Sequence, residues 1–204
     1  MVDIISTMKE SPAIELNQRI AQRVRDLRAQ GGYSLDVLST RSGVSRSMLS
    51  LVERGESSPT AVVLERIATG LNVTLASLFE NPQATTEPIA RYADQLLWQD
   101  PHSGYVRRNV TPASLGAAVQ IVEVLFPPQA RVMYESTTRE PVVQQQIWIL
   151  EGTMEVTLGT TTHTLHTGDC LVMVLNQTMA YHNPTQHTAR YAVVIANLAK
   201  PWSP

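Results

Sequence analysis

Apolar residues in the first eighty positions recur at helical spacing. The first apolar stripe comprises Ile14, Ile20, Val24 and Leu27. It predicts a helix over about residues 12–30. Ser34 and Ser45 each stand where a serine caps a further helix, and a fourth helix is expected over about residues 61–71. With a short last turn or helix over residues 74–79, this part of the chain predicts a compact bundle of five short helices.

The pattern changes in the second half of the chain. Residues 105–200 are rich in Val, Ile, Thr and Tyr in short runs that Gly and Pro separate, which is typical of β-strands. Between the two patterns lies a stretch with two prolines and no bulky apolar residue, which indicates a linker. The sequence therefore predicts an all-α domain over residues 1–80, a linker over 81–90 and an all-β domain over 91–204.

Composition narrows the class of protein. The 204 residues are 43% hydrophobic and 17% charged, which excludes a disordered or fibrous chain. No run reaches the roughly 18 apolar residues of a membrane span, and the start lacks a secretion signal, so a cytoplasmic location and no membrane partner are expected. A single cysteine, Cys170, excludes an intramolecular disulfide and a cysteine-based zinc finger. We interpret it as a small buried hydrophobic residue, with a redox-sensing thiol as the alternative.

Positive charge gathers in the helical half although the whole chain has a net charge of −2. Residues 19–54 hold seven Arg against three acidic residues, a local excess of four positive charges that suits nucleic acid. On a helix that begins after Ser45, one side carries Arg46, Ser47, Ser50, Leu51 and Arg54, and the other carries Met48, Leu49 and Val52. Arg, Ser and Leu side chains can contact base edges and phosphates in a major groove. Any amphipathic helix also has a polar side, so a merely solvated face remains the alternative.

The spacing of these motifs carries a family resemblance. Residues 19–79 contain Ser34-Leu35-x-x-Leu38, Gly43-Val44-Ser45, Glu53-Arg54-Gly55 and Ser58-Pro59-Thr60. This arrangement resembles the Cro/C1-type (XRE) helix-turn-helix domain of phage and bacterial repressors. The resemblance implies that the helix beginning at Ser45 is the recognition helix and that the helix beginning at Ser34 approaches phosphate. The implied DNA-binding residues are Ser34, Ser45, Arg46, Ser47, Ser50, Leu51 and Arg54.

A second resemblance covers about residues 118–196. Its residues are Gln145 to Leu150 with Glu151-Gly152, then Gly159, Gly168-Asp169 and Tyr181-x-Asn183-Pro184. They resemble the cupin fold, a double-stranded β-helix of the jelly-roll kind. A helix-turn-helix, a linker and a small cupin in this order resemble bacterial regulators whose cupin senses a small molecule, and residues 56–60 and 67–73 look like those of the sulfur-utilisation regulators.

The metal-ligand positions of enzymatic cupins carry unsuitable residues. The acidic ligand falls on Gln145, the last histidine falls on Met179, and the His-x-His region falls on residues 137–141, which contain no histidine. The sequence therefore predicts no metal, no other cofactor and no enzyme activity. A metal-dependent cupin isomerase or oxygenase with an appended helix-turn-helix is the alternative, and a module that binds a partner protein is a third interpretation.

Strand alternation indicates a pocket inside the β domain. If Gln145 points inward, then Ile147 and Ile149 do as well, and Met179 and Tyr181 do so on a later strand. Glu135 and Arg139 are expected at the mouth, where Arg would pair with a carboxylate and Glu with an amine, as in an amino acid. The expected ligand-binding residues are Glu135, Arg139, Gln145, Ile147, Met179 and Tyr181. A surface ion pair over a plain core is the alternative.

These observations together predict a transcription regulator that binds a specific DNA sequence and a small-molecule effector. One helix-turn-helix reads few bases, so a homodimer on a palindromic operator is expected, with half-sites about one helical turn, or 34 to 36 Å, apart.

Overall fold

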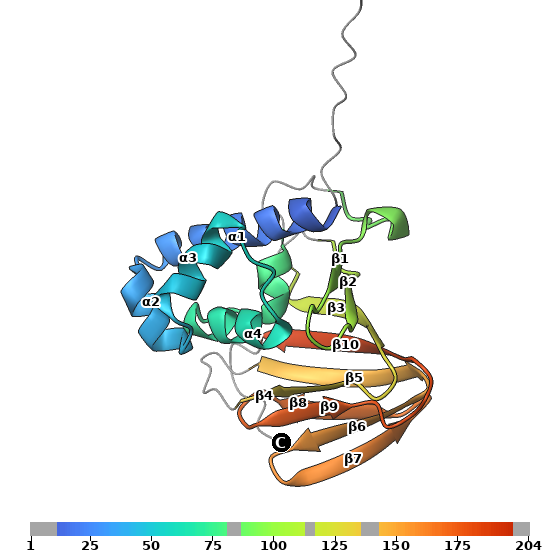
Figure 1. Ribbon diagram of the computed structural model, residues 1–204. Coiled ribbons are helices and arrows are strands. Elements are labelled where there is room, and N and C mark those ends of the chain that lie inside the picture. Colours follow the sequence, from blue (N-terminus) through green and yellow to red (C-terminus); the bar gives the residue numbers. More distant parts are fainter. Residues whose placement is uncertain (1–11, 81–86, 113–116, 136–142, 198–204) are drawn as a thin grey trace, which may run out of the picture.

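The computed structural model describes residues 12–80, 87–112, 117–135 and 143–197 (Figure 1). A helical part comes first in the chain and packs against one side of a β part. No helix in these ranges is long and apolar enough to cross a membrane.

Within residues 12–80, the helical part has four α-helices and one 3-10 helix. They are α1 (Pro12–Gln30), α2 (Leu35–Ser42), α3 (Arg46–Arg54), α4 (Ala61–Gly70) and the 3-10 helix η1 (Leu75–Phe79). The predicted fifth helix is thus present as a 3-10 turn. Ser34, Ser45 and Thr74 cap the amino ends of α2, α3 and η1 by accepting a backbone N–H. Gly43 ends α2 with φ of 66°, a left-handed conformation that a residue with a Cβ rarely adopts.

A buried ion pair joins α1 to α3. Arg28 donates from Nε and Nη2 to the two carboxylate oxygens of Glu53 at 2.6 and 2.9 Å, and from Nη1 to the carbonyl oxygen of Tyr33. The side chain of Glu53 is 7% exposed. The hydrogen bonds between Arg28 and Glu53 raise the pKa of the Arg28 guanidinium. The pair therefore fixes the packing side of α3, and its opposite side is turned to the solvent.

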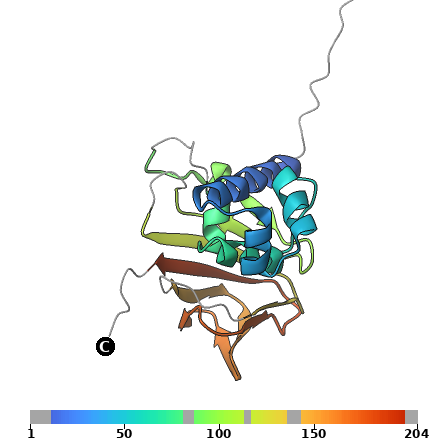
Figure 2. The ribbon, with the colours of Figure 1, turned by 90° about the vertical axis from the view of Figure 1, so that its left-hand side faces the viewer.

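The described residues of the β part form two antiparallel sheets. Its strands are β1 (Leu97–Gln99), β2 (Val106–Asn109), β3 (Val119–Phe126), β4 (Arg131–Tyr134), β5 (Val143–Glu151), β6 (Thr153–Leu158), β7 (Thr161–His166), β8 (Cys170–Val174), β9 (Met179–His182) and β10 (Ala189–Asn197), preceded by a short 3-10 helix, η2 (Tyr92–Asp94). One sheet has the order β1-β2-β3-β10-β5-β8 and the other β4-β9-β6-β7. The sheets face each other across the β-domain core (Figure 2), as in the cupin double-stranded β-helix.

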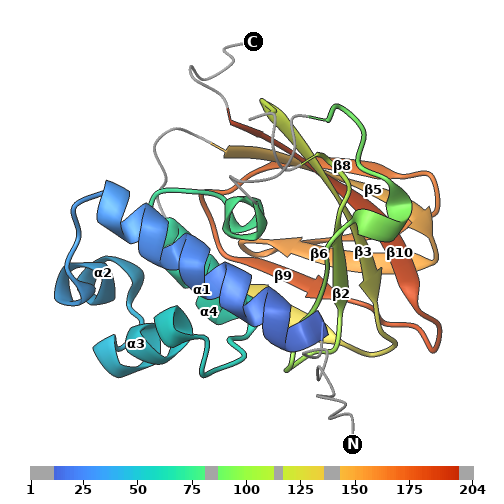
Figure 3. The ribbon, with the colours of Figure 1, turned by 90° about the horizontal axis from the view of Figure 1, so that it is seen from above.

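The two parts share one apolar core. Aromatic rings form a continuous series through it, with neighbouring centroids 5.6 to 6.5 Å apart, in the order Phe79, Trp98, Tyr105, Phe126, Tyr191, Tyr181 and Tyr134. The series begins in η1 and ends inside the β part. By contrast, α2 and α3 lie at the end of the helical part that faces away from the β part (Figure 3).

Cys170 corrects one prediction, because it is exposed and not buried. It begins β8, which is an edge strand of the six-stranded sheet, and pairs with Trp148 of β5. Trp148 is itself 51% exposed. Both residues lie on the outer face of the sheet, since neighbouring positions on a strand alternate between its two faces. The apolar residues beside Cys170 gave no information on which face it occupies.

Candidate DNA-binding helix and β-domain cavity

The predicted DNA-binding face lies on the surface of α3. Arg46, Ser47 and Arg54 are exposed, whereas Ser50 and Leu51 are half-buried. On the opposite side Leu49 and Val52 are buried and Met48 packs against the core, as the helical period predicts. The structure thus brings these five predicted residues together on one accessible face, and their contact with DNA remains a prediction.

Two further predicted residues, Ser34 and Ser45, are helix caps. Their Oγ atoms accept the backbone N–H of Val37 at 3.1 Å and of Met48 at 3.3 Å. A hydroxyl that accepts one hydrogen bond still has its own proton to donate. Both side chains belong to exposed residues at helix amino ends, where backbone dipoles favour an anion. Capping is therefore compatible with a phosphate contact.

The arginines of this face pair with exposed carboxylates. Arg46 lies 3.3 Å from Asp36, and Arg54 lies 2.8 Å from Glu56. The hydrogen bond from Arg54 lowers the pKa of Glu56. Exposed pairs of this kind add little to stability. Both guanidinium groups can therefore exchange their carboxylate for a phosphate or a guanine edge at little cost.

A cavity lies between the two sheets and reaches the helical part. Its volume is about 60 Å³. The described lining comprises Glu65, Thr74, Leu75, Tyr105, Arg107, Val124, Phe126, Val132, Tyr134, Gln145, Leu175, Met179, Tyr181, Tyr191, Val193 and Ile195. Gln145 donates from Nε2 to the hydroxyl of Tyr181 at 2.9 Å, and that hydroxyl donates to the sulfur of Met173 at 3.8 Å. Burial raises the pKa of the Tyr181 phenol, so it stays neutral at physiological pH.

The cavity contains only some of the predicted ligand-binding residues. Gln145, Met179 and Tyr181 line it, whereas Ile147 is buried but is absent from the described lining. Glu135 does not line it and forms an ion pair with Arg66 of α4 at 2.8 Å, over a neighbouring surface depression that shares Glu65 and Tyr134 with the cavity wall. The position of Glu135 at the cavity mouth therefore stays a prediction. Arg139 lies outside the described residues.

The sequence reasoning missed three kinds of lining residue. Tyr105 and Arg107 were detectable, because two residues that alternate on a strand share a face. Tyr134 and Tyr191 carried no local signal that distinguished them from ordinary core residues. Glu65, Thr74 and Leu75 belong to the helical part, and no pattern within that part reveals that they reach a cavity of the other part.

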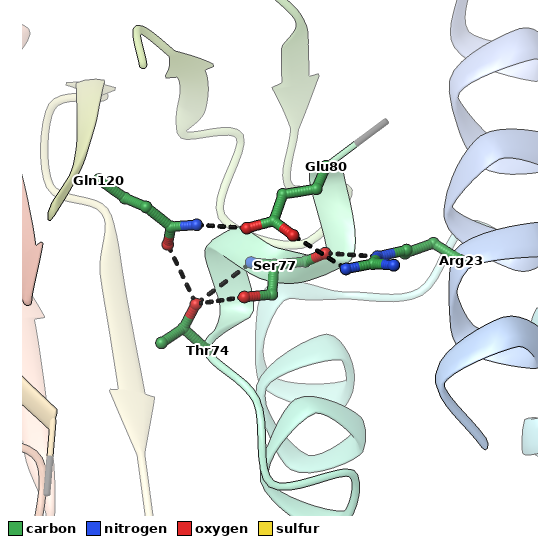
Figure 4. Close-up of polar contacts among 5 residues, drawn as sticks. All are labelled: Arg23, Thr74, Ser77, Glu80 and Gln120. Carbon is green, nitrogen blue, oxygen red and sulfur yellow. Dashed lines mark hydrogen bonds and ion pairs between the residues drawn. The ribbon is translucent and has the colours of Figure 1, made fainter. Parts of the chain in front are cut away.

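A polar network joins the helical part to β3 beside this cavity (Figure 4). Arg23 of α1 donates to the carbonyl oxygen of Ser77 at 3.0 Å and to Glu80 at 2.9 Å. Gln120 of β3 donates to Glu80 and accepts from the hydroxyl of Thr74 at 3.2 Å. Burial raises the pKa of Glu80. Thr74 lines the cavity and also belongs to this network, so it connects the two.

The described residues include no group of three or more His, Cys, Asp or Glu side chains that could hold a metal ion. At the positions of the cupin ligands, Gln145 makes the hydrogen bond to Tyr181 and Met179 is an apolar part of the lining. His182 pairs with Glu155 at 2.8 Å in the four-stranded sheet. Metal independence stays a prediction.

The fold and the exposed α3 define a helix-turn-helix protein with a cupin-type domain. Residues 24–78 match the family model HTH_3, described as helix-turn-helix, and this segment is a domain of that XRE-type family.

Comparison with whole proteins extends the similarity beyond that domain. The chain is 29% identical over 182 residues to the HTH-type transcriptional regulator SutR of Escherichia coli (strain K12), which covers 86% of this chain and 93% of that protein. It is 34% identical over 67 residues to SinR of Bacillus subtilis (strain 168), 32% of this chain and 60% of the relative. The crystal structure of an HTH_3 family transcriptional regulator from Vibrio cholerae is similar with a TM-score of 0.73 and 26% identity, covering 93% of this chain and 99% of that one. The chain is a homologue of these regulators, which supports the prediction that it is not an enzyme.

Proposed function

We propose that this protein regulates transcription in the cytoplasm by binding a palindromic DNA operator as a homodimer, and that a small-molecule effector in the β-domain cavity controls this binding without a metal. The observation that carries the proposal is the position of the cavity. Its wall includes Thr74 and Leu75 of the helical part, so a ligand there contacts the part of the chain that carries α3. An effector can shift an equilibrium only through such differential contacts.

The outer face of the six-stranded sheet supports the homodimer. It exposes several apolar side chains, among them Val119, Ile121 and Leu125 of β3, Trp148 of β5 and Val172 of β8. A contiguous exposed apolar patch on a globular protein marks an interaction site. A second copy can cover it with the same face about a two-fold axis, which is the symmetry that a palindromic operator requires.

In vitro selection with the purified full chain tests the DNA-binding part. We expect enrichment of an inverted repeat and an affinity that falls steeply with salt, because phosphate contacts release counterions. Enrichment of a single half-site would argue against the homodimer. A shallow salt slope without any enriched sequence would favour the protein-interaction module instead.

Sedimentation of Trp148→Asp tests the dimer surface. The buried charge should dissociate the dimer and weaken operator binding, whereas Thr164→Asp on the exposed strand β7 should do neither. An unchanged sedimentation coefficient for Trp148→Asp would exclude this face as the interface.

A thermal-stability screen against amino acids and sulfur metabolites, with and without EDTA, tests the effector part. A ligand that binds only the folded protein raises its melting temperature. We expect hits that EDTA leaves unchanged. Stabilisation that EDTA abolishes, with stoichiometric metal in the purified protein, would favour the metal-dependent cupin enzyme.

A further inference from the structure

The described lining of the cavity includes a buried cation whose hydrogen bonds are incomplete. Arg107 of β2 lines the cavity and is only 6% exposed. Its Nε donates to the side-chain oxygen of Asn109 at a long 3.4 Å, and its guanidinium carbon lies 5.4 Å from the ring centre of Phe79. Its Nη2 atom is buried and has no hydrogen-bond partner among the described residues.

A buried charged donor without an acceptor is costly, so its presence calls for an explanation. Glu65 is the one carboxylate in the described lining. It makes no hydrogen bond to Nη2, and it is engaged in an interaction of its own. Nη2 therefore lacks an acceptor that a ligand entering the cavity can supply. A carboxylate fits best, because a charged acceptor makes the stronger hydrogen bond to a guanidinium N–H.

The remaining lining limits the rest of the ligand. The hydroxyls of Tyr105 and Tyr134 lie 3.3 Å apart and are buried. Burial raises the pKa of Tyr105 to about 12, so its phenol stays neutral and offers a hydrogen bond without negative charge. The other walls are mostly apolar, for example Val193 and Ile195. One water needs about 10 to 15 Å³ by the same measure as the 60 Å³ of this cavity, which leaves room for about four to six non-hydrogen atoms.

We infer that the effector is a small organic monoanion, a carboxylate with a short apolar chain, whose carboxylate binds Arg107. This inference rests on the proposed function, because it takes the cavity as the effector site. The sequence suggested that Glu135 and Arg139 together bind an amino acid. In the present inference the guanidinium of Arg107 alone binds the ligand, through its acid group.

Three probes of nearly equal size and different charge test the inference in the full chain: propanoate, propanamide and propylammonium, at constant ionic strength. The readouts are the melting temperature and calorimetric binding. We expect propanoate alone to stabilise the protein. Arg107→Met should weaken propanoate binding by about tenfold or more, because a charge-assisted pair is lost, and Arg107→Lys should restore part of it.

Arg108→Met is the matched control. Arg108 is the next residue on β2 but faces away from the cavity, where it pairs with Glu123 at 3.3 Å and stacks on Tyr92. This variant should bind propanoate like the parent protein. Equal binding of propanamide and propanoate, or unchanged propanoate binding in Arg107→Met, would contradict the inference that Arg107 recognises an anion. Either result would still leave the cavity as an effector site. Failure of all three probes would overturn the inference, and only the absence of any hit in the wider effector screen would also contradict the proposed effector function.

Discussion

The helical part and the β part build their candidate sites in opposite ways. The DNA-binding face belongs mainly to one helix of nine residues, α3. The described lining of the cavity takes residues from six strands and from two elements of the helical part. A site on one helix follows from a local period, because neighbours three and four apart share a face. A cavity depends on how distant segments pack, and this difference decides what a sequence can reveal.

The largest expected effect concerns the joint between the two parts, which is the packing of the helical part against the β part around Trp98. Trp98 is 4% exposed, and its ring lies between those of Phe79 and Tyr105. Trp98→Ala should lower the free energy of unfolding by about 3 to 5 kcal/mol, because it leaves a cavity in the shared core. It should also separate the unfolding of the helices, followed by far-UV circular dichroism, from that of the β part, followed by near-UV signals. The parent protein should unfold in one transition.

Leu97→Ala is the control for this variant. Leu97 precedes Trp98 on β1, points to the other face and is 49% exposed. It should cost about 1 kcal/mol or less and keep the single transition. If Trp98→Ala also unfolded in one transition with a small loss of stability, the two parts would not depend on each other through this joint.

Within the helical part, the buried pair between Arg28 and Glu53 should contribute the next largest effect. Glu53→Ala leaves a largely buried guanidinium without its carboxylate, which should cost about 3 kcal/mol in urea unfolding. Glu56→Ala removes an exposed carboxylate that also pairs with an arginine, and it should leave stability nearly unchanged. Equal effects of the two variants would show that burial does not determine the strength of these pairs.

The sequence predicted the helical part better than the cavity for physical reasons. The bounds of α1, the caps Ser34 and Ser45 and the packing side of α3 all follow from local chemistry. The β fold and its turn at Gly152 followed from motifs, since Gly152 has φ of 85°. The cavity was only partly predicted.

Strand alternation predicted only three of the sixteen described lining residues, namely Gln145, Met179 and Tyr181. Gln145 and Tyr181 were placed inward correctly, but Arg107 comes from another strand and Thr74 from the helical part. Cys170 was assigned to the wrong environment, because an edge strand alternates between core and solvent. In each case the sequence did not show which face of a strand a residue occupies or which distant residues it contacts, because long-range packing determines both.

On the DNA-binding face, Arg46→Ala should weaken specific binding by about 1 to 3 kcal/mol and relax the preference at one base position. Arg46 heads the exposed face of α3, and its side chain is 67% exposed. Binding to selected and singly substituted operators measures both effects. Arg131→Ala, on the exposed face of β4, should change neither. An unaltered base preference in Arg46→Ala would remove this residue from sequence readout.

The smallest expected effect compares two glutamates that both pair with arginine but titrate in opposite directions. Burial raises the pKa of Glu80 above its ordinary value of 4.5, so the folded protein binds this proton more tightly than the unfolded chain does. Its contribution to the free energy of unfolding should therefore fall as the pH rises from below 4.5 through the raised value. The hydrogen bond from Arg54 lowers the pKa of Glu56, so its contribution should be present above 4.5 and be lost as the pH falls through the lowered value.

Urea unfolding of the parent protein, Glu80→Gln and Glu56→Gln between acidic and neutral pH separates these contributions. The difference between parent and Glu80→Gln should decrease with rising pH, and the difference between parent and Glu56→Gln should increase. Added salt should reduce the Glu56 effect more, because that pair is exposed and screened. If the stability difference changed with pH in the same direction for both glutamates, the network between Arg23, Glu80 and Gln120 would be open to solvent. The packing between the two parts would then be looser than these hydrogen bonds indicate.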